Sequence, residues 1–407
     1  MLHSRRIAPG MLCVPFVGMD KNSCVKQKSE ATATVARDRR KRMKQQTAAS
    51  PKTGIRVLKA VLKIVGGFFL FVLVTAGLLA GALYCGLQVL INGPSPTARD
   101  LFVRTVCETS AAGFLAEMFL TDEQIEQIVL GSGETEYVET DTSLIQLPVK
   151  NPDSTEPSGD DGADHWGLVD EDGDGIILEK VNGEGFSGHL MIVLDPSRVI
   201  MGSVPEQYGG RGYTVGGMAE KFGAVAAINA GGFYDPDGTG NGSTPEGVAV
   251  FDGKVYTFGS YNRQKEGFAG FDDKNILHVG SFTIQQIRER NIQYGVSFGP
   301  MLIVNGEMQD NLVSGVNPRT GIAQRSDGAV MLLVIDGRQL HSQGATYEDM
   351  AEVFLEYGAV NAYNLDGGSS SMMWFNGEYV NKSASLIGIR PVPTTFLVLP
   401  KGANDNG

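Results

Sequence analysis

The chain has 407 residues, of which 42% are apolar and 20% charged, which is enough for one large or two moderate domains with a hydrophobic core. Its net charge of −12 is unevenly distributed: residues 1–63 carry 15 Lys and Arg against 3 Asp and Glu, and residues 92–407 carry 19 against 43. The resulting −24 on the larger part argues against nonspecific binding of nucleic acids or other polyanions.

The first predicted element is a membrane-spanning helix. Residues 64–91 run for 28 positions without a charge, whereas about 20 apolar residues suffice to cross a bilayer as a helix. The basic segment 1–63 before it predicts a cytoplasmic N-terminus and an extracellular remainder, since positive charge stays inside. A cleaved signal peptide is the alternative, because Ala80-Gly81-Ala82 offers small residues, and Met43 is an alternative start.

Two further segments separate this helix from the main domain. Residues 92–130 have apolar side chains at helical spacing, and Thr121 to Gln124 resemble a helix start for residues 125–130, so we predict membrane-proximal helices. Residues 131–175 are acidic and rich in Gly, Pro, Ser and Thr, and residues 152–164 in particular have the composition of a linker.

The end of this acidic segment resembles a calcium-binding loop only in part. Asp170, Asp172 and Asp174 have the spacing of the first EF-hand ligands, but the twelfth position is Val181 where the motif needs Glu. We interpret it as an acidic turn before a strand. Weak calcium binding is the alternative, and no other cofactor is expected.

From residue 176 to about residue 400 the sequence alternates between strands and turns. Four Asp-Gly or Asn-Gly pairs lie between apolar stretches, at residues 252–253, 305–306, 327–328 and 376–377, and such pairs favour two-residue hairpin turns. One helix is clearly indicated after Thr346, where Asp349 completes a capping box and Gly358 follows the last apolar position. We predict an α+β domain with a largely antiparallel or mixed sheet and few covering helices.

Polar groups follow several of the predicted strands. An apolar run ends in Asp366-Gly367-Gly368-Ser369-Ser370, which places a carboxylate, bare backbone and hydroxyls at one edge of the core. Three similar polar groups lie elsewhere in the sequence. The first is Asn229 with Asp235 and Glu246, the second is residues 317–320, and the third is residues 336–338. Arg390 is a candidate for a fifth group. Together they offer carboxylates for proton transfer and arginines for binding phosphate.

Other chemistries fit less well. A serine hydrolase would place its nucleophile on a strand-to-helix elbow, whereas the serines after Gly368 lead into another strand without a histidine nearby in sequence. The sequence leaves open whether His189, His278 or His341 lies close to these serines in the folded protein. Zinc is not expected, because there is neither a Cys pair nor an H-E-x-x-H motif.

Five motifs in one order resemble the phosphodiester glycosidase family: AAINAGGFYDPDGTGNG, SFGPMLIVNGE, NPRTGIAQRSDG, NLDGGSSSMMW and RPVPTTFLV. The resemblance covers about residues 188–399. Matching family positions fall on Asn229, Gly231 and Gly232 with Ala230 inserted, on residues 318–322, and on residues 366–370 with Ser369 in place of a third glycine.

The resemblance implies hydrolysis of a sugar-1-phosphodiester, such as one of N-acetylglucosamine. Combined with the predicted membrane anchor, it leads us to expect a role in envelope or exopolysaccharide metabolism. Arg319 and Arg390 would hold the phosphate, and Asp366 with one of Asp336, Asp235 or Glu246 would act as acid and base. The remaining candidates would contact the sugar: Asn229, Gly231, Gly232, Gly367, Gly368, Ser369 and Ser370. The alternative is a noncatalytic module that binds envelope glycans or assists their assembly.

Overall fold

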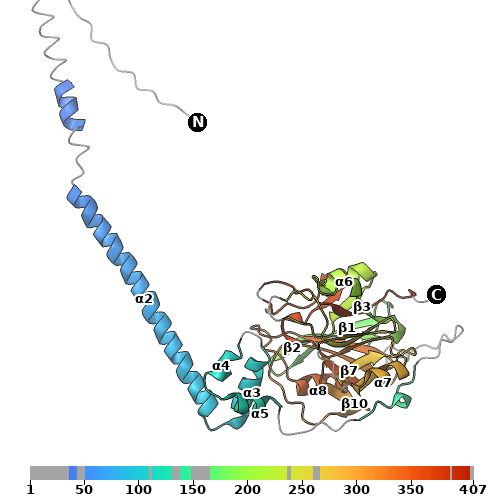
Figure 1. Ribbon diagram of the computed structural model, residues 1–407. Coiled ribbons are helices and arrows are strands. Elements are labelled where there is room, and N and C mark those ends of the chain that lie inside the picture. The colour runs from blue at the N-terminus through green and yellow to red at the C-terminus, as the bar shows by residue number, and fades with distance from the viewer. Residues whose placement is uncertain are drawn as a thin grey trace, which may run out of the picture. The chain divides into compact units, whose positions relative to one another are not determined.

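The computed structural model describes residues 36–43, 51–109, 112–130, 138–147, 166–235, 240–259, 266–385 and 387–403 (Figure 1). The predicted linker at residues 152–164 lies outside these ranges. The chain divides into two compact units, residues 1–87 and residues 88–407, and all strands of the described residues lie in the second.

The first unit is dominated by the long helix α2, Pro51–Asn92. Its segment Gly54–Asn92 has a mean hydropathy of 2.3 over its most apolar window, and none of that window is buried by the protein. At about 1.5 Å per residue such a helix exceeds the ~30 Å thickness of a hydrocarbon core. The predicted span at residues 64–91 therefore lies inside a longer helix, which by length and composition is a candidate membrane span or signal sequence.

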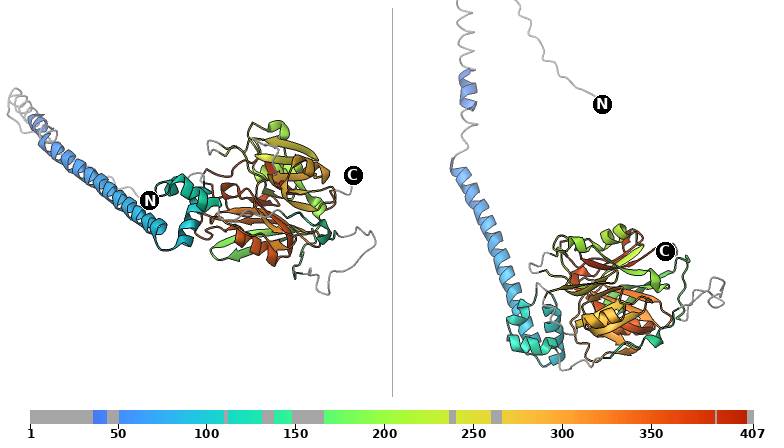
Figure 2. Two further views of the ribbon diagram at one scale, coloured as in Figure 1. Left: turned by 60° about the horizontal axis from the view of Figure 1, so that its bottom comes forward. Right: turned by 45° about the vertical axis from the view of Figure 1, so that its right-hand side comes forward.

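The second unit begins with three short helices, α3 (Pro96–Cys107), α4 (Phe114–Glu117) and α5 (Asp122–Leu130). Val103, Val106, Ala116 and Ile128 form a small buried core between them. We refer to residues 96–130 as the helical element. Both views of Figure 2 show it (teal) against one side of the strand-rich domain.

Seventeen strands in the described residues form three sheets, and every pairing is antiparallel, which confirms the predicted α+β class. The seven-stranded sheet has the order β1 (Ile176–Gly183), β2 (Phe186–Val193), β13 (Val330–Ile335), β12 (Arg319–Arg325), β14 (Ala359–Leu365), β10 (Met301–Val304) and β11 (Glu307–Met308). One five-stranded sheet has the order β16 (Glu378–Tyr379), β15 (Met373–Phe375), β4 (Ala226–Asn229), β17 (Thr394–Val398) and β3 (Val199–Ser203). The other has the order β6 (Lys254–Phe258), β5 (Gly247–Phe251), β9 (Tyr294–Ser297), β7 (Glu266–Phe271) and β8 (Leu277–Phe282).

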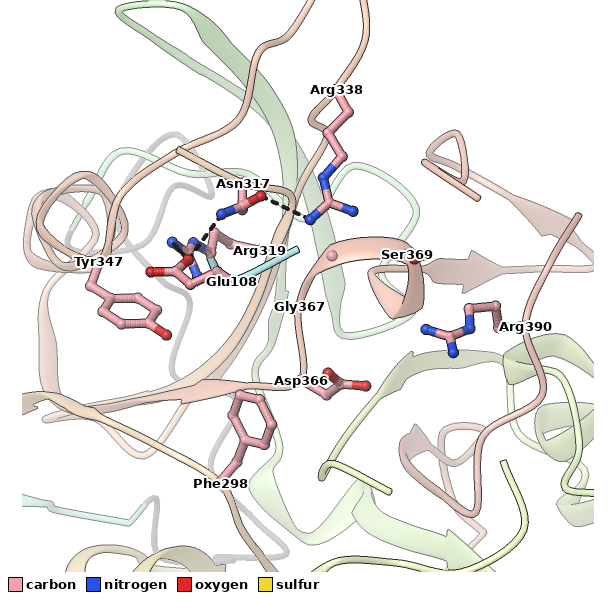
Figure 3. Close-up of a pocket in the computed structure, with 11 residues that line it drawn as sticks. Glu108, Phe298, Asn317, Arg319, Arg338, Tyr347, Asp366, Gly367, Ser369 and Arg390 are labelled. Atoms are coloured by element: carbon pink, nitrogen blue, oxygen red, sulfur yellow. Dashed lines mark hydrogen bonds and ion pairs between the residues drawn. The ribbon is translucent and has the colours of Figure 1, made fainter. Parts of the chain in front are cut away.

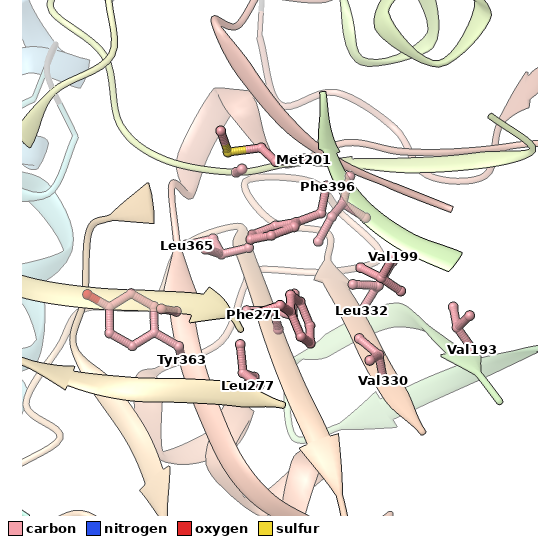
Figure 4. Close-up of a cluster of buried hydrophobic side chains, with 14 of the residues drawn as sticks. Val193, Val199, Met201, Phe271, Leu277, Val330, Leu332, Tyr363, Leu365 and Phe396 are labelled. Carbon is pink, nitrogen blue, oxygen red and sulfur yellow. The ribbon is translucent and has the colours of Figure 1, made fainter. Parts of the chain in front are cut away.

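All three sheets contribute to one hydrophobic core (Figure 4). Leu332 of β13, Phe271 of β7 and Phe396 of β17 meet there, and all are at most 1% exposed. Strand β13 is apolar on both faces: its alternate residues Met331, Leu333 and Ile335 belong to a second core. This interior strand is therefore covered on both sides, which explains its unbroken apolar sequence.

Three helices cover the outer faces. Helix α8 (Tyr347–Glu356) packs Met350 and Phe354 into the second core, and its predicted capping box is present. Helix α6 (Val215–Phe222) covers the sheet that contains β4, while α7 (Ile284–Glu289) places Ile287 against the third sheet. Figure 1 shows α6 and α8 on opposite sides of the domain.

Three of the four predicted turns form as expected. Asp252-Gly253, Asn305-Gly306 and Asn376-Gly377 have positive φ at both residues and connect paired strands. The prediction for Asp327-Gly328 is wrong in its type: the four residues 326–329 connect β12 and β13, and of the Asp-Gly pair only the glycine has a positive φ. The longer loop lets Asp327 bind the backbone N–H of Ala329.

Removing side-chain volume from the shared core tests its contribution to stability. We expect Leu332→Ala to lower the free energy of unfolding by about 2–5 kcal/mol, the usual cost of a cavity in a packed core. Leu340→Ala is the matched control, because Leu340 is fully exposed. Urea unfolding followed by tryptophan fluorescence compares the two; equal losses would contradict the packing described here.

Candidate active site

Residues beside the ends of strands from all three sheets meet at a pocket of about 250 Å³ (Figure 3). Asp366 follows β14, Arg319 begins β12, Arg390 precedes β17, and Phe298 follows β9. The pocket is lined by Glu108, Phe298, Asn317, Arg319, Arg338, Tyr347, Asp366, Gly367, Gly368, Ser369 and Arg390. Six of these were predicted from the sequence: Arg319, Asp366, Gly367, Gly368, Ser369 and Arg390.

Asp366 is held through its backbone by the end of β4. Its N–H donates to the carbonyl oxygen of Ala230 at 2.9 Å, and its carbonyl oxygen accepts from Asn229 Nδ2 at 2.6 Å. Asn229 Oδ1 in turn accepts from Thr320 Oγ1 at 2.9 Å and from the Met372 N–H at 3.1 Å. Asn229 is fully buried, so its amide positions Asp366 and has no free surface for a sugar.

The glycines after Asp366 are required by the backbone. A Cβ on Gly367 would lie 2.8 Å from the carbonyl oxygen of Pro318, and Gly368 has a φ of +61°. The short 3₁₀ helix η4 (Gly368–Ser370) then turns the chain so that Ser369 lines the pocket, while the Ser370 hydroxyl is buried and donates to the Asp366 carboxylate.

Burial raises the pKa of Asp366 to about 6, against the opposing effects of the Ser370 hydrogen bond and the positive charge of Arg390. The negative charge of Glu246 contributes to the rise. A carboxyl group that titrates near neutrality at the wall of a pocket is suited to proton transfer.

Arg319 is almost completely enclosed, with 4% of its surface exposed. Its Nε donates to the Ala345 carbonyl oxygen at 2.9 Å, and its Nη2 donates to Glu108 Oε2 at 2.8 Å and to the Gly315 carbonyl oxygen. The guanidinium lies 4.2 Å from the centre of the Tyr347 ring. These contacts fix one positive charge at the pocket wall.

Arg338 supplies a second positive charge beside it. Its Nη2 donates to Asn317 Oδ1 at 2.8 Å and to Thr109 Oγ1 at 2.9 Å (Figure 3). Its backbone has a φ of +57°, which is costly for an arginine and marks a constrained position. Burial and then repulsion from Arg319 lower the pKa of Arg338. Sequence reasoning noted Arg338 after Asp336-Gly337 but gave it no role.

Arg390 forms the third cation of the pocket and is paired with Asp235. Asp235 also accepts from the Gly240 N–H at 2.9 Å, and Arg390 lies 5.3 Å from the centre of the Phe233 ring. Asp235 does not line the pocket. The structure therefore places it behind Arg390, as an orienting partner.

Gly231 and Gly232 leave room for neighbouring groups. A Cβ on Gly231 would approach Val296 and Ser297 to about 3.1–3.2 Å, and one on Gly232 would lie 2.9 Å from the ring of Phe298. Glu246 also lies near Gly232, without lining the pocket itself. The glycines thus let Phe298, which is 42% exposed, form one wall.

Asp336 is directed elsewhere. Its carboxylate lies 3.1 Å from His341 Nε2 and 3.1 Å from Asn381 Nδ2, and it is absent from the pocket lining. The histidines are not at the site. His278 Nε2 lies 3.0 Å from the Asp272 carboxylate, and His189, His278 and His341 are all absent from the pocket lining. This arrangement gives no support to a serine hydrolase triad.

Glu108, Phe298 and Tyr347 were missed by sequence reasoning, and Asn317 received no role. Phe298 stands within the family-like motif SFGPMLIVNGE and could have been found there. Glu108 is the C-cap residue that follows helix α3, more than 200 residues upstream of Arg319, and no local pattern indicates their contact.

A group of three carboxylates within reach of one metal ion occurs in the described residues at Asp170, Asp172 and Asp174. Their oxygens accept from backbone N–H groups of the same turn, as in Gly175 to Asp170 at 2.9 Å and Ile176 to Asp174 at 2.7 Å. These bonds agree with the interpretation as an acidic turn. The turn contributes no residue to the pocket.

The strand-rich part of the chain is similar to a known protein family. Residues 222–399 match the model of the family described as phosphodiester glycosidase. This part of the chain is thus similar to that family. This finding confirms the resemblance carried by the sequence motifs and supports a hydrolase of sugar phosphodiesters.

Two curated relatives and one solved structure are similar to parts of the chain. The SPbeta prophage-derived uncharacterized protein YomE of Bacillus subtilis (strain 168) is 29% identical over 52% of this chain and 33% of the relative. N-acetylglucosamine-1-phosphodiester alpha-N-acetylglucosaminidase of Bos taurus is 37% identical over 17% of this chain and 13% of the relative. The chain therefore spans a third or less of either relative's length. The catalytic domain of the zebrafish enzyme of that name, auto-inhibited by its pro-peptide, has a TM-score of 0.47 at 20% identity, covering 56% of this chain and 82% of that chain.

The raised pKa of Asp366 predicts how stability depends on pH. The folded protein binds this proton more tightly than the unfolded chain, so the ionised carboxylate destabilises the fold as pH rises from about 4 through about 6. Asp366→Asn removes that ionisation. We expect the stability of the variant relative to the natural protein to increase between pH 4 and pH 8 in urea unfolding.

The matched control is Asp273→Asn, which removes an exposed carboxylate and corrects for the loss of one negative charge. A stability difference for Asp366→Asn that stays constant over this pH range would contradict the environment described for Asp366.

Proposed function

We propose that this domain hydrolyses a glycosyl-1-phosphodiester and releases the sugar. The observation that carries the proposal is the juxtaposition of Asp366, with a pKa of about 6, and the cations Arg319, Arg338 and Arg390 in one pocket. A phosphodiester carries one negative charge, and arginine forks bind phosphate oxygens through paired N–H groups. The family match supports the same reaction class.

The roles follow from the positions. Arg338 and its neighbours bind the phosphate, and the exposed face of Phe298 offers an apolar surface for the sugar ring. Asp366 accepts a proton from water as the water oxygen bonds to the anomeric carbon. The bond from that carbon to the phosphate oxygen breaks, and its electron pair leaves with the phosphate.

Asn229, Ser370 and Asp235 support these groups from behind. Asn229 and Ser370 hold the backbone and the carboxylate of Asp366, and Asp235 orients Arg390. Glu246 acts through its charge, which contributes to the raised pKa of Asp366. Ser369 is the hydroxyl of this group that lines the pocket and is the one available to the sugar.

For the cellular setting, we propose that α2 anchors the protein in a bacterial cell membrane, with residues 1–63 in the cytoplasm and the domain outside. The apolar length of α2 and the basic segment before it support this topology. The substrate would then be a glycosyl phosphodiester of the envelope or an exopolysaccharide. N-acetylglucosamine is the sugar proposed, because the bovine relative is named for it.

The role of Asp366 can be tested with a synthetic N-acetylglucosamine 1-phosphodiester by following sugar release. Because a general base must be ionised, we expect kcat to rise as pH increases through about 6. Asp366→Asn should lower kcat by roughly 10²–10⁴-fold, the usual contribution of a positioned base. A rate that falls over that pH range would instead make Asp366 an acid, and a fully active variant would remove it from the chemistry.

The role of Arg338 in binding phosphate predicts an effect on KM. Arg338→Gln should raise KM for the phosphodiester by roughly 10–100-fold, since hydrogen bonds to charged groups are worth about 1.5–3 kcal/mol. Arg288→Gln is the control, because Arg288 is exposed on α7. A KM for Arg338→Gln no higher than that of the control would place the phosphate elsewhere.

A further inference from the structure

Exposed apolar side chains of the strand-rich domain gather around the pocket. Among the described residues from 176 to 403, the large apolar side chains that are exposed are Tyr234, Phe298, Leu340, Ile387 and Ile389. Phe298 lines the pocket. Each of the others is within three positions of a residue that lines the pocket or of Asp235, which pairs with Arg390. Single exposed apolar residues are ordinary on a protein surface, whereas their gathering at one place is typical of a binding surface.

A second cavity, of about 240 Å³, adjoins the pocket and shares Arg390 with it. Its apolar wall is formed by Ile387, Ile389 and Pro391, and we refer to it as the isoleucine cavity. Ile387 is 75% exposed and Ile389 is 36% exposed. The charged side chains that line this cavity in the described part of the chain are two cations, Arg211 and Arg390. The isoleucine cavity therefore presents apolar surface directly beside positive charge.

Arg390 is fixed at the boundary between the two cavities. Its guanidinium is directed toward Asp366 (Figure 3) and pairs with Asp235. Gly240 lies against the other side of this guanidinium: a Cβ on Gly240 would be 2.1 Å from Arg390 Nε, and the φ of Gly240 is +64°. A side chain at this position would displace Arg390, so the glycine keeps the cation between the pocket and the isoleucine cavity.

The shape of a phosphodiester matches two cavities that share a cation. Its phosphorus joins two alcohols, the sugar and the aglycone, which is the group that keeps the phosphate after the sugar has left. A substrate whose phosphate lies at Arg390 must direct these two groups in different directions. The proposed function places the sugar in the pocket, beside Asp366 and Phe298. The isoleucine cavity then receives the aglycone, because it is the cavity that continues from Arg390 away from the pocket.

We propose that the isoleucine cavity binds an aliphatic aglycone, so that the substrate is a glycosyl phosphodiester of a lipid alcohol. This inference rests on the proposed function for the positions of the phosphate and the sugar. A second sugar as aglycone would gain little from covering two exposed isoleucines. An aliphatic chain removes their surface and its own from water, which is favourable. The membrane anchor proposed for α2 keeps the domain beside such lipids.

The test measures the Kd for methyl, propyl and hexyl phosphate, which are the products expected from substrates of this class. The full-length chain in lipid nanodiscs is titrated in a calorimeter, and empty nanodiscs correct for partitioning of the probes into lipid. Complete burial of one CH₂ group strengthens binding about fourfold, and half of that free energy, about twofold, is expected on a partly exposed wall. Hexyl phosphate should therefore have a Kd roughly 30-fold below that of methyl phosphate.

A double variant, Ile387→Ser with Ile389→Ser, removes the apolar wall, and the exposure of both side chains leaves the core intact. We expect it to bind the three phosphates with nearly equal Kd. Leu130→Ser is the matched control, because Leu130 is an exposed apolar residue of α5 that lines neither cavity; it should keep the dependence on chain length. Equal Kd values along the series in the natural protein overturn the inference. A dependence that the double variant keeps does so too, because the chain would then bind elsewhere.

Sugar release from the corresponding methyl, propyl and hexyl diesters of N-acetylglucosamine 1-phosphate separates this inference from the proposed function. A kcat/KM that rises with chain length, and rises less in the double variant, supports both. A Kd that depends on chain length and on the two isoleucines, without sugar release from any diester, supports the inference and contradicts the proposed function. Sugar release with the same kcat/KM for all three diesters supports the proposed function and overturns the inference.

Discussion

The buried amide of Asn229 is the contact on which the site depends. Its nitrogen holds the Asp366 backbone at the end of β14, and its oxygen accepts from Thr320 on β12 and from Met372 before β15. Strand β4, which carries Asn229, belongs to a different sheet from β12 and β14. One side chain therefore fixes two sheets to each other where the proposed chemistry takes place. A buried amide with all these partners is far more demanding of geometry than an apolar contact.

The same arrangement explains why the sequence predicted part of the site. Turn chemistry and apolar runs locate the ends of strands, so Asp366, Arg319 and Arg390 could be found from glycines, prolines and the polar residues beside them. A strand end does not reveal to which side a carboxylate points. Asp336 and Asp235 have the same local pattern, yet one faces His341 and Asn381 and the other faces Arg390.

The fold class was predictable because its signals are local. The residues of the hairpin turns adopt positive φ, and the cap of α8 is formed by hydrogen bonds between residues at most four positions apart. The contact of Glu108 with Arg319 is not local. It depends on how the helical element meets a distant part of the chain, and periodicity within one segment carries no information about such a contact.

The order of strands also has a consequence for folding. The strands of the third sheet follow one another in the sequence from Gly247 to Ser297. By contrast, β2 ends at Val193 but pairs with β13, which begins at Val330. In the described part of the chain, β3 pairs with β17 alone. Closing such long loops costs entropy before any contact repays it, and it slows folding. During synthesis the early hairpin β1–β2 has an unpaired edge until about 140 further residues have emerged. An exposed strand edge is prone to pair with other chains, so this hairpin is the part of the domain most open to aggregation before β13 has emerged.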